Sequence, residues 1–191
     1  AVKNGVDLVI ELPFVFACNN AEYFAMGAMG ILNSLGCISH FSFGSESGEL
    51  RELLKVAKIL VDEGPEFREA LKRFLNQGIS YPRARFEALK ELEGEEAASL
   101  IRDPNNILAV EYLKQWIRSE SRMEPIVIKR VGKGYHDGDV TNPLASAAAI
   151  RRTLVGKRAI DAAVRKAIPE ATADVMDHSA GKPVTDSEPL F

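Results

Sequence analysis

The sequence lacks a long uninterrupted hydrophobic run and an excess of positive charge. Its longest apolar-rich stretch, around Leu8 to Cys18, is broken by Glu11 and Pro13 and is shorter than the roughly 20 apolar residues of a membrane-spanning helix. No segment has the pattern of a secretory signal peptide. The formal net charge is -3, so overall charge gives no argument for nucleic-acid binding, while local basic patches stay open.

Cysteine is also scarce. Cys18 and Cys37 are the only two, and they lie in apolar sequence without the spacing of a metal site. We therefore expect buried free thiols and a cytoplasmic protein, because disulfides belong mainly to secreted domains.

What the chain does contain is typical of a globular protein. With 46% hydrophobic and 27% charged residues among 191, it fits one domain, or one domain with a small annex. Ala1 to Lys3 resemble the last turn of a helix that stops at Asn4-Gly5, and the chain ends on the apolar stretch Glu188 to Phe191. Both ends lead us to expect a piece of a longer protein.

The first 44 residues predict an α/β unit. Asp7 to Glu11 (DLVIE) is a short β-branched run, typical of a strand buried in a parallel sheet. Asn19 and Glu22 have the spacing of a capping box for a helix that Gly36 ends. CISHFSF, residues 37–43, predicts a second strand, so we expect a strand-helix-strand crossover.

The middle of the chain has helical periodicity. The expected helices cover residues 50–63, 65–76, 81–92 and 106–118. The β-branched run PIVIKR, residues 125–130, then predicts a return to the sheet, followed by a glycine-rich loop over 131–142. Further helices are expected from about Ser146 and over residues 158–168.

The expected fold is therefore an α/β, parallel-sheet, Rossmann-like core with a helical insertion. Its first part is residues 1–48, the insertion is 49–120, and the core resumes over 121–168. Residues 169–191 are expected to begin a C-terminal region.

Three predicted strands end in polar or glycine residues. These ends are Glu11, Gly44 to Glu46, and Lys129-Arg130. Because ligands of open α/β sheets bind outside the carboxyl ends of the strands, we expect a site there. Gly44 either turns the chain or lets the ribose or base of a nucleotide approach the backbone.

Two helix starts could contribute to the same kind of site. Ser146 begins the helix that contains Arg151, and a helix terminus near an arginine favours phosphate, although the segment alone is better explained by Ser146 as an ordinary cap. Asn105 and Asn106 open another helix, where one amide could cap and the other could bind a base or ribose. No Walker-type phosphate loop is present.

Other polar residues give weaker indications of a binding or catalytic role. Arg83 and Arg85 begin a basic helix face that could meet nucleic-acid phosphates or simply face solvent. His136 and its neighbouring aspartates are better explained by turn chemistry than by a metal site. His40 is expected as a packed strand residue.

Taken in order, several motifs resemble those of the bacterial tRNA(Met) cytidine acetate ligases. They are GVDLVIELPFVFA, AEYFAMGAMGILNSLG, FGSESGE, SYPRAR, PNNILAVEYLK, IKR, YHD and ASAAAIR, and they extend over residues 1 to about 155. The resemblance implies a fold like that of the HIGH-type nucleotidyltransferases. It also implies an enzyme that uses ATP to activate acetate as acetyl-adenylate and acetylates N4 of the wobble cytidine of elongator tRNA(Met).

By this resemblance, ATP contacts fall on Gly44, on the Asn105-Asn106 pair with Asn106 favoured, and on Arg130. Ser146 and Arg151 match the phosphate-binding helix start of the superfamily, but this chain has alanines at positions 147 and 148 where a hydroxyl would be expected. Mg²⁺ is expected with ATP, and no carboxylate cluster identifies its site.

The His-x-Gly-His motif with which the family begins does not occur in this sequence. We therefore expect a core that is incomplete at its N-terminus, catalytic residues that cannot be named here, and a fragment that is inactive alone. Two alternatives stay open: a nucleotidyltransferase that makes a dinucleotide cofactor, and a non-catalytic RNA-binding module.

Overall fold

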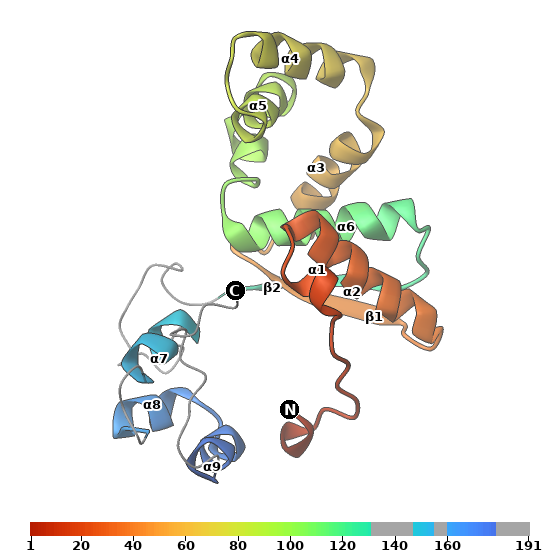
Figure 1. The fold of residues 1–191 in the computed structure, drawn as a ribbon. Coiled ribbons are helices and arrows are strands. Elements are labelled where there is room, and N and C mark those ends of the chain that lie inside the picture. The colour runs from red at the N-terminus through yellow and green to blue at the C-terminus, as the bar shows by residue number, and fades with distance from the viewer. Residues whose placement is uncertain (131–146, 155–159, 179–191) are drawn as a thin grey trace. The chain divides into compact units, whose positions relative to one another are not determined.

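A computed structural model of the chain describes residues 1–130, 147–154 and 160–178 (Figure 1). Two compact units make up the chain. One is Glu11–Arg130, and the other combines Ala1–Ile10 with the region from Val131 onward. Nearly all of the predicted sheet and insertion belongs to the first unit.

A two-stranded parallel sheet lies at the base of the first unit. Strand β1 (His40–Ser45) pairs with β2 (Glu124–Lys129) in the register His40 to Glu124 through Ser45 to Lys129. Alternate residues of β1 are buried, among them Phe41 and Phe43, whose rings lie 5.6 Å apart. The parallel sheet and its alternation confirm the predicted α/β class.

Two helices precede β1. Helix α1 (Phe14–Ala17) is a single turn, and α2 (Ala21–Leu35) is capped by Asn20, whose side chain accepts a hydrogen bond from the backbone N–H of Tyr23. A Cβ at Gly27 of α2 would lie 2.4 Å from Cγ of Phe16. Glycine at position 27 therefore lets the two helices pack closely.

Four helices join β1 to β2, close to where periodicity placed them. They are α3 (Leu50–Asp62), α4 (Pro65–Asn76), α5 (Tyr81–Ser99) and α6 (Pro104–Arg118). Helix α6 packs against α2, α3 and β1, while α4 packs against α5 at the far end of α3 (Figure 1). The helical pattern of α5 is interrupted at Gly94, which has a φ of 88°.

The core runs through these helices to the sheet. Its fully buried members include Leu53 of α3, Phe67 of α4, Leu89 of α5 and Leu113 of α6, together with Met29 of α2. Burial of each such side chain is worth about 1.5–3 kcal/mol, so these contacts between helices contribute much of the stability of the first unit.

The expected strand Asp7 to Glu11 is wrong for this structure. These residues form no strand, and Leu8, Val9 and Ile10 are exposed. A strand needs a hydrogen-bonded neighbour, and within the described residues only β1 and β2 pair. The crossover between parallel strands is consequently made by α3 to α6 and not by α2.

Two smaller expectations also need correction. Cys18 and Cys37 are exposed, because each follows the end of a helix on a surface connection. His40 is on the exposed face of β1, where its Nε2 lies 3.5 Å from the Glu124 carboxylate. By contrast, the predicted helix end at Asn4-Gly5 is present, because a short 3₁₀ helix, Val2–Asn4, ends at Gly5 with a φ of 93°.

The described part of the second unit after residue 130 includes the helices α7 (Ala147–Leu154), α8 (Ala162–Ala167) and α9 (Glu170–His178). Asp161 caps α8 by accepting a hydrogen bond from the N–H of Val164. The predicted loop 131–142 and Ser146 lie outside the described residues. None of the helices in the described ranges has the length and apolar character needed to span a membrane.

Candidate functional site

The carboxyl ends of β1 and β2 meet the N-terminus of α6. Gly44 lies opposite Ile128 in the sheet, and the N–H of Arg130 extends the ladder by donating to the carbonyl oxygen of Ser45 at 2.9 Å. Asn105 and Asn106 occupy the first turn of α6. The sheet and helix thus bring together four of the predicted site residues, which we call the strand-end cluster: Gly44, Asn105, Asn106 and Arg130.

Gly44 presents open backbone on the exposed face of β1. A Cβ there would lie 3.5 Å from Cγ of Arg130 and 3.8 Å from its Cδ, which is ordinary contact. The stem of Arg130 therefore lies along Gly44, and the fold itself would accept a small side chain at this position.

The loop after β1 is held close to β2 by a second glycine. Gly48 has a φ of 71°, and a Cβ there would lie 2.6 Å from the Cβ of Lys129. A larger residue would both strain the backbone and push against the strand. Gly48 therefore shapes the loop that carries Glu46.

Glu46 caps α6 from this loop. Its Oε2 accepts a hydrogen bond from the N–H of Asn106 at 2.7 Å, and its Oε1 accepts one from the N–H of Asn105 at 3.2 Å. A carboxylate is well suited to a helix N-terminus, where backbone N–H groups are unpaired and the dipole is positive. The loop and the helix are therefore locked together at the site.

The environment of Glu46 favours its charged form. Partial burial alone would raise the pKa of its carboxyl, but the hydrogen bonds from the Asn105 side chain and from the backbone N–H groups of Glu46, Asn105 and Asn106 outweigh burial. The pKa of Glu46 consequently lies below its ordinary value.

The side chain of Asn105 joins Glu46 to Arg130. Its Nδ2 donates to Oε1 of Glu46 at 2.6 Å, and its Oδ1 accepts from Nη1 of Arg130 at 3.1 Å. Asn105 is only half-buried. Its contacts with Glu46 and Arg130 use one amide hydrogen and one lone pair, so the side chain has capacity for a second donor and a second acceptor contact.

Asn106 lies on the inner side of the same turn and is 2% exposed. Its Oδ1 accepts hydrogen bonds from Oγ of Ser45 at 2.7 Å and from the N–H of Ser47 at 3.1 Å. Its Nδ2 lies 3.5 Å from Oδ2 of Asp103. Asn106 therefore fixes the loop from within, and Asn105 is the amide at the surface.

Sequence reasoning noticed that Glu46 follows a strand but gave it no role. Its partners, Asn105 and Asn106, are 59 and 60 positions away, so no local spacing connects them. Glu46 directly follows β1, and Asp103 occupies the cap position of α6 without making a side-chain cap bond, so only the structure shows that Glu46 supplies the cap.

The two arginines of the basic helix face have different surroundings. Arg83 is exposed, and its guanidinium lies 2.5 Å from Glu87 and over the ring of Phe86. Arg85 is 18% exposed, and its Nη1 lies 3.6 Å from the buried Glu111. Only Arg83 is on an open surface.

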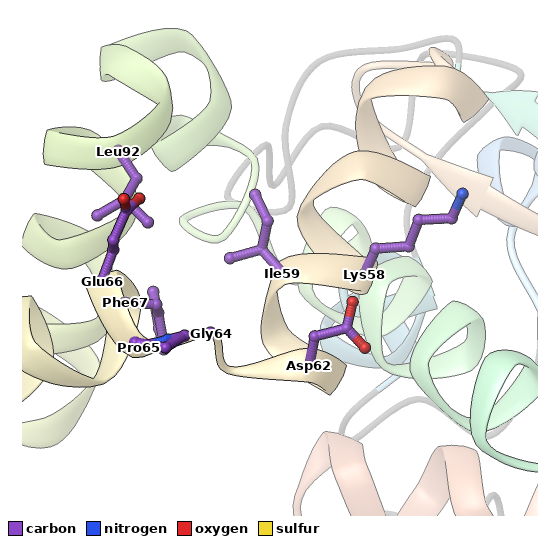
Figure 2. A pocket seen from close by; sticks show the side chains of 8 residues that line it. All are labelled: Lys58, Ile59, Asp62, Gly64, Pro65, Glu66, Phe67 and Leu92. Carbon is purple, nitrogen blue, oxygen red and sulfur yellow. The ribbon is translucent and has the colours of Figure 1, made fainter.

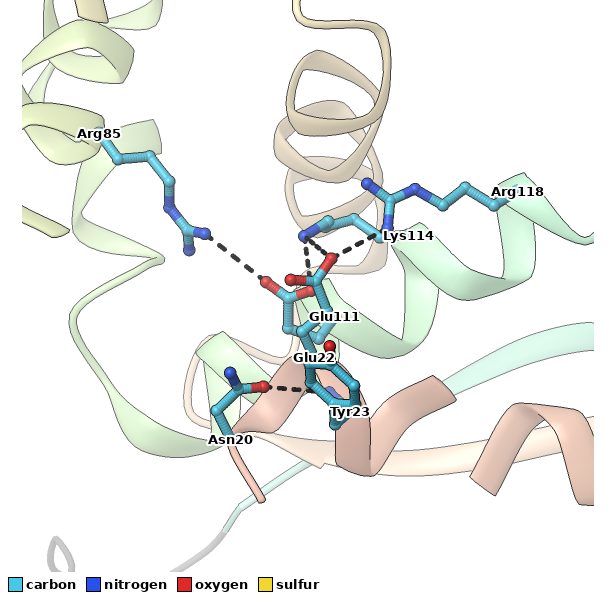
Figure 3. A network of polar contacts seen from close by, with 7 residues as sticks. All are labelled: Asn20, Glu22, Tyr23, Arg85, Glu111, Lys114 and Arg118. Carbon is cyan, nitrogen blue, oxygen red and sulfur yellow. Dashed lines mark hydrogen bonds and ion pairs between the residues drawn. The ribbon is translucent and has the colours of Figure 1, made fainter. Parts of the chain in front are cut away.

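Arg85 belongs to a network of charges that links α2, α5 and α6 (Figure 3). Lys114 is almost fully buried, and it donates to Glu111 at 2.6 Å and to Glu22 at 3.5 Å. Arg118 donates to Glu22 at 3.0 Å, and chiefly this bond, against partial desolvation, lowers the pKa of Glu22. The network is structural, because its charges satisfy one another.

A cavity of about 400 Å³ lies at the turn between α3 and α4, next to α5 (Figure 2). It is lined by Lys58, Ile59, Asp62, Gly64, Pro65, Glu66, Phe67 and Leu92. The lining is largely apolar and shares no residue with the strand-end cluster. Nowhere in residues 1–130, 147–154 or 160–178 do three or more His, Cys, Asp or Glu residues gather as metal ligands would.

The remaining predicted phosphate contacts belong to the second unit. Arg151 is an exposed residue of α7, whereas Ser146 precedes the described part of that helix. Both assignments stay predictions.

The chain is similar in sequence to proteins of known family. The chain is 41% identical over 184 residues to the tRNA(Met) cytidine acetate ligase of Clostridium acetobutylicum, covering 92% of this chain and 45% of that protein. It is 48% identical over 155 residues to the tRNA(Met) cytidine acetate ligase of Caldicellulosiruptor saccharolyticus, and this match covers 81% of this chain and 38% of that protein. The chain thus spans less than half the length of these relatives.

Among solved structures, TmcAL of Thermotoga maritima bound with alpha-thio ATP superimposes with a TM-score of 0.82 at 35% identity. That match covers 93% of this chain and 41% of the other. It confirms the predicted nucleotidyltransferase-like α/β fold. The model of the HIGH nucleotidyl transferase family matches residues 1–191, and the chain therefore belongs to that family.

Proposed function

We propose that the protein uses ATP to activate acetate as acetyl-adenylate and then acetylates N4 of the wobble cytidine of elongator tRNA(Met). The observation that carries this proposal is the strand-end cluster, where Gly44, Asn105 and Arg130 converge beside the carboxyl ends of two parallel strands. Such strand ends are where α/β proteins bind nucleotides. The similarity to a TmcAL bound with alpha-thio ATP supports the same reading.

Within the cluster, each residue has a distinct proposed contact. Gly44 offers open backbone to the ribose or base, and Arg130 offers a planar guanidinium to charged oxygens. The described hydrogen-bond partner of Arg130 is the neutral side chain of Asn105, which leaves the guanidinium positively charged toward a ligand. We propose Asn105 as the amide that contacts ATP, because Asn106 is buried and its oxygen is already engaged.

Acetate, Mg²⁺ and further phosphate contacts complete the proposal. Mg²⁺ would accompany ATP and neutralise phosphate charge. Ser146 and Arg151 remain proposed phosphate contacts at a helix start. ATP and tRNA as substrates imply a cytoplasmic protein.

For tRNA we propose Arg83 as a phosphate contact and add Arg102. The guanidinium groups of Arg83 and Arg102 lie 5.4 Å and 4.1 Å from the centre of the Phe86 ring, and both side chains are more than half exposed. Arg83 also pairs with Glu87 and Arg102 with Glu95, but these ion pairs are exposed and therefore weak, so a phosphate backbone can compete for the two guanidinium groups. Arg85 is better explained as a partner of Glu111.

The deciding experiment is isotope exchange between pyrophosphate and ATP, with and without acetate, using the intact protein. Acetate-dependent exchange supports the ligase. Exchange that needs a phosphorylated partner and not acetate would instead support a nucleotidyltransferase that makes a dinucleotide cofactor. Salt-dependent tRNA binding without any exchange, unaffected by Arg130→Lys, would support a non-catalytic RNA-binding module.

A further inference from the structure

We infer that Glu46 is a positioning residue, which sets the orientation of the Asn105 amide and, through it, of the Arg130 guanidinium. The inference rests on the proposed nucleotide site, since it assigns how that site is held in its binding geometry. Its basis is a chain of two hydrogen bonds that connects three side chains. They are Glu46 in the loop after β1, Asn105 in the first turn of α6, and Arg130 directly after β2.

The Glu46 carboxylate dictates which way the Asn105 amide faces. Only the amide nitrogen can donate to a carboxylate, and Nδ2 of Asn105 does so at 2.6 Å. Rotating the amide by half a turn would place its oxygen against the carboxylate, which is repulsive. Oδ1 therefore points the other way, to Nη1 of Arg130.

Arg130 depends on that oxygen for its orientation. Among the described residues, Asn105 supplies the hydrogen bond acceptor that the structure gives to the Arg130 guanidinium. The Arg130 stem lies along Gly44, with Cγ 3.5 Å from the position of a Cβ there. A long side chain held at its tip and along its stem loses less freedom when a ligand binds, which favours affinity.

Capping alone does not account for Glu46. The cap consists of the two bonds from the N–H groups of Asn105 and Asn106, and a carboxylate would make these without the side chain of Asn105. The third bond, to Nδ2, is the shortest of the three. It leads away from the helix axis to the predicted ligand-binding residue.

The test compares Glu46→Gln with Glu49→Gln in the intact protein, each alone and combined with Asn105→Ala. Glu49 is an exposed neighbour whose side chain makes no capping bond, so its variant is a matched charge control. ATP affinity is measured by calorimetry and stability by chemical denaturation. We expect Glu46→Gln to weaken ATP binding roughly tenfold, the scale of a lost charge-assisted hydrogen bond, and Glu49→Gln to change it less than about twofold.

The combination separates positioning from capping. If Glu46 acts through Asn105, Glu46→Gln should have little further effect on ATP affinity once Asn105→Ala is present. Equal losses in both backgrounds, or a loss of stability with unchanged ATP affinity, would reduce Glu46 to a helix cap and overturn the inference.

A measurement without ATP tests the orientation directly. In the unmodified protein, NMR signals of the Asn105 Nδ2 protons should follow the titration of a carboxyl group at low pH, and Glu46→Gln should abolish this dependence. An Asn105 amide that is insensitive to that titration overturns the inference even if no variant folds. If Asn105→Ala leaves ATP affinity unchanged, the proposed nucleotide site fails, and the NMR titration still decides whether Glu46 orients Asn105.

Discussion

The side-chain oxygen of Asn105 accepts a hydrogen bond from Nη1 of Arg130 at 3.1 Å, across 25 positions of sequence. This contact joins the start of α6 to the residue that follows β2, while the stem of Arg130 lies along Gly44. The geometry depends on the fork of arginine, because lysine offers a single ammonium on a flexible stem.

Arg130→Lys should therefore keep the charge and lose the alignment. We expect adenylation to fall by about tenfold or more, since hydrogen bonds to charged groups are worth about 1.5–3 kcal/mol. The adenylation rates of Arg130→Lys and Lys129→Arg, measured side by side, check this prediction. Lys129 is the adjacent strand residue, and its Cβ faces Gly48, so its variant should be close to neutral. A larger loss at Lys129 would show that the wrong side chain has been assigned to the nucleotide.

Asn105 and Asn106 should respond in opposite ways to truncation. Asn106→Ala removes the acceptor of Ser45 Oγ and of the Ser47 N–H inside the protein, and we expect it to destabilise the fold by about 1–3 kcal/mol. Asn105→Ala should cost less stability and more ATP affinity. Denaturation midpoints and calorimetry on both variants measure the difference, and the reverse ranking would make Asn106 the ligand-binding amide.

Sequence reasoning worked where the information is local. Residues 65–76 were expected as a helix, and α4 has these bounds because Pro65 pre-sets the first turn and the apolar spacing is helical. It failed at Asp7 to Glu11, whose β-branched composition fits a strand but which has no strand partner in the described structure. Strand formation depends on a distant neighbour, and composition does not supply one.

The candidate site likewise contains residues that local sequence identifies and residues that only distant contacts define. Gly44 and Arg130 could be proposed because strand ends are visible in the sequence, and the structure brings them together. The resemblance favoured Asn106 over Asn105, whereas packing buries Asn106 and leads us to propose Asn105; both fit a helix start, so local sequence could not distinguish them. Charge on Arg85 could not reveal its burial against Glu111 either.

Stability should fall in acid as two carboxylates lose their charge. The pKa values of Glu46 and Glu22 are lowered in the folded protein from an ordinary value of 4.5. For a lowered pKa, the stabilisation is present above the unfolded-state pKa and is lost as pH falls through the folded-state pKa. We expect the unfolding free energy to decline below about pH 4.5 and the decline to be shallower in Glu46→Gln. An identical acid profile in that variant would contradict the prediction.

Arg83 and Arg85 should separate tRNA binding from folding. Arg85→Ala leaves Glu111 with one cation fewer in a buried setting, so we expect a loss of about 1–3 kcal/mol in stability. Arg83→Ala removes an exposed side chain and should change stability by about 0.5 kcal/mol or less, yet weaken tRNA binding and reduce its salt dependence. Filter binding at several salt concentrations measures this, and unchanged tRNA affinity in Arg83→Ala would exclude Arg83 from the interface.

Substitution at Gly44 tests the proposed approach of the nucleotide to the sheet. The Gly44 backbone does not have the positive φ that requires glycine, and a Cβ would make ordinary contact with the Arg130 stem. Gly44→Ala should therefore fold normally and weaken ATP binding slightly, whereas Gly44→Val should weaken it strongly, because its methyl groups would occupy the ligand's space and displace Arg130. Gly30→Ala on the exposed side of α2, where nothing lies within 4 Å of a new Cβ, is the control and should leave ATP affinity unchanged. Calorimetry measures the ATP affinity of each folded variant. An ATP affinity that is the same in Gly44→Val as in the unmodified protein would remove Gly44 from the site.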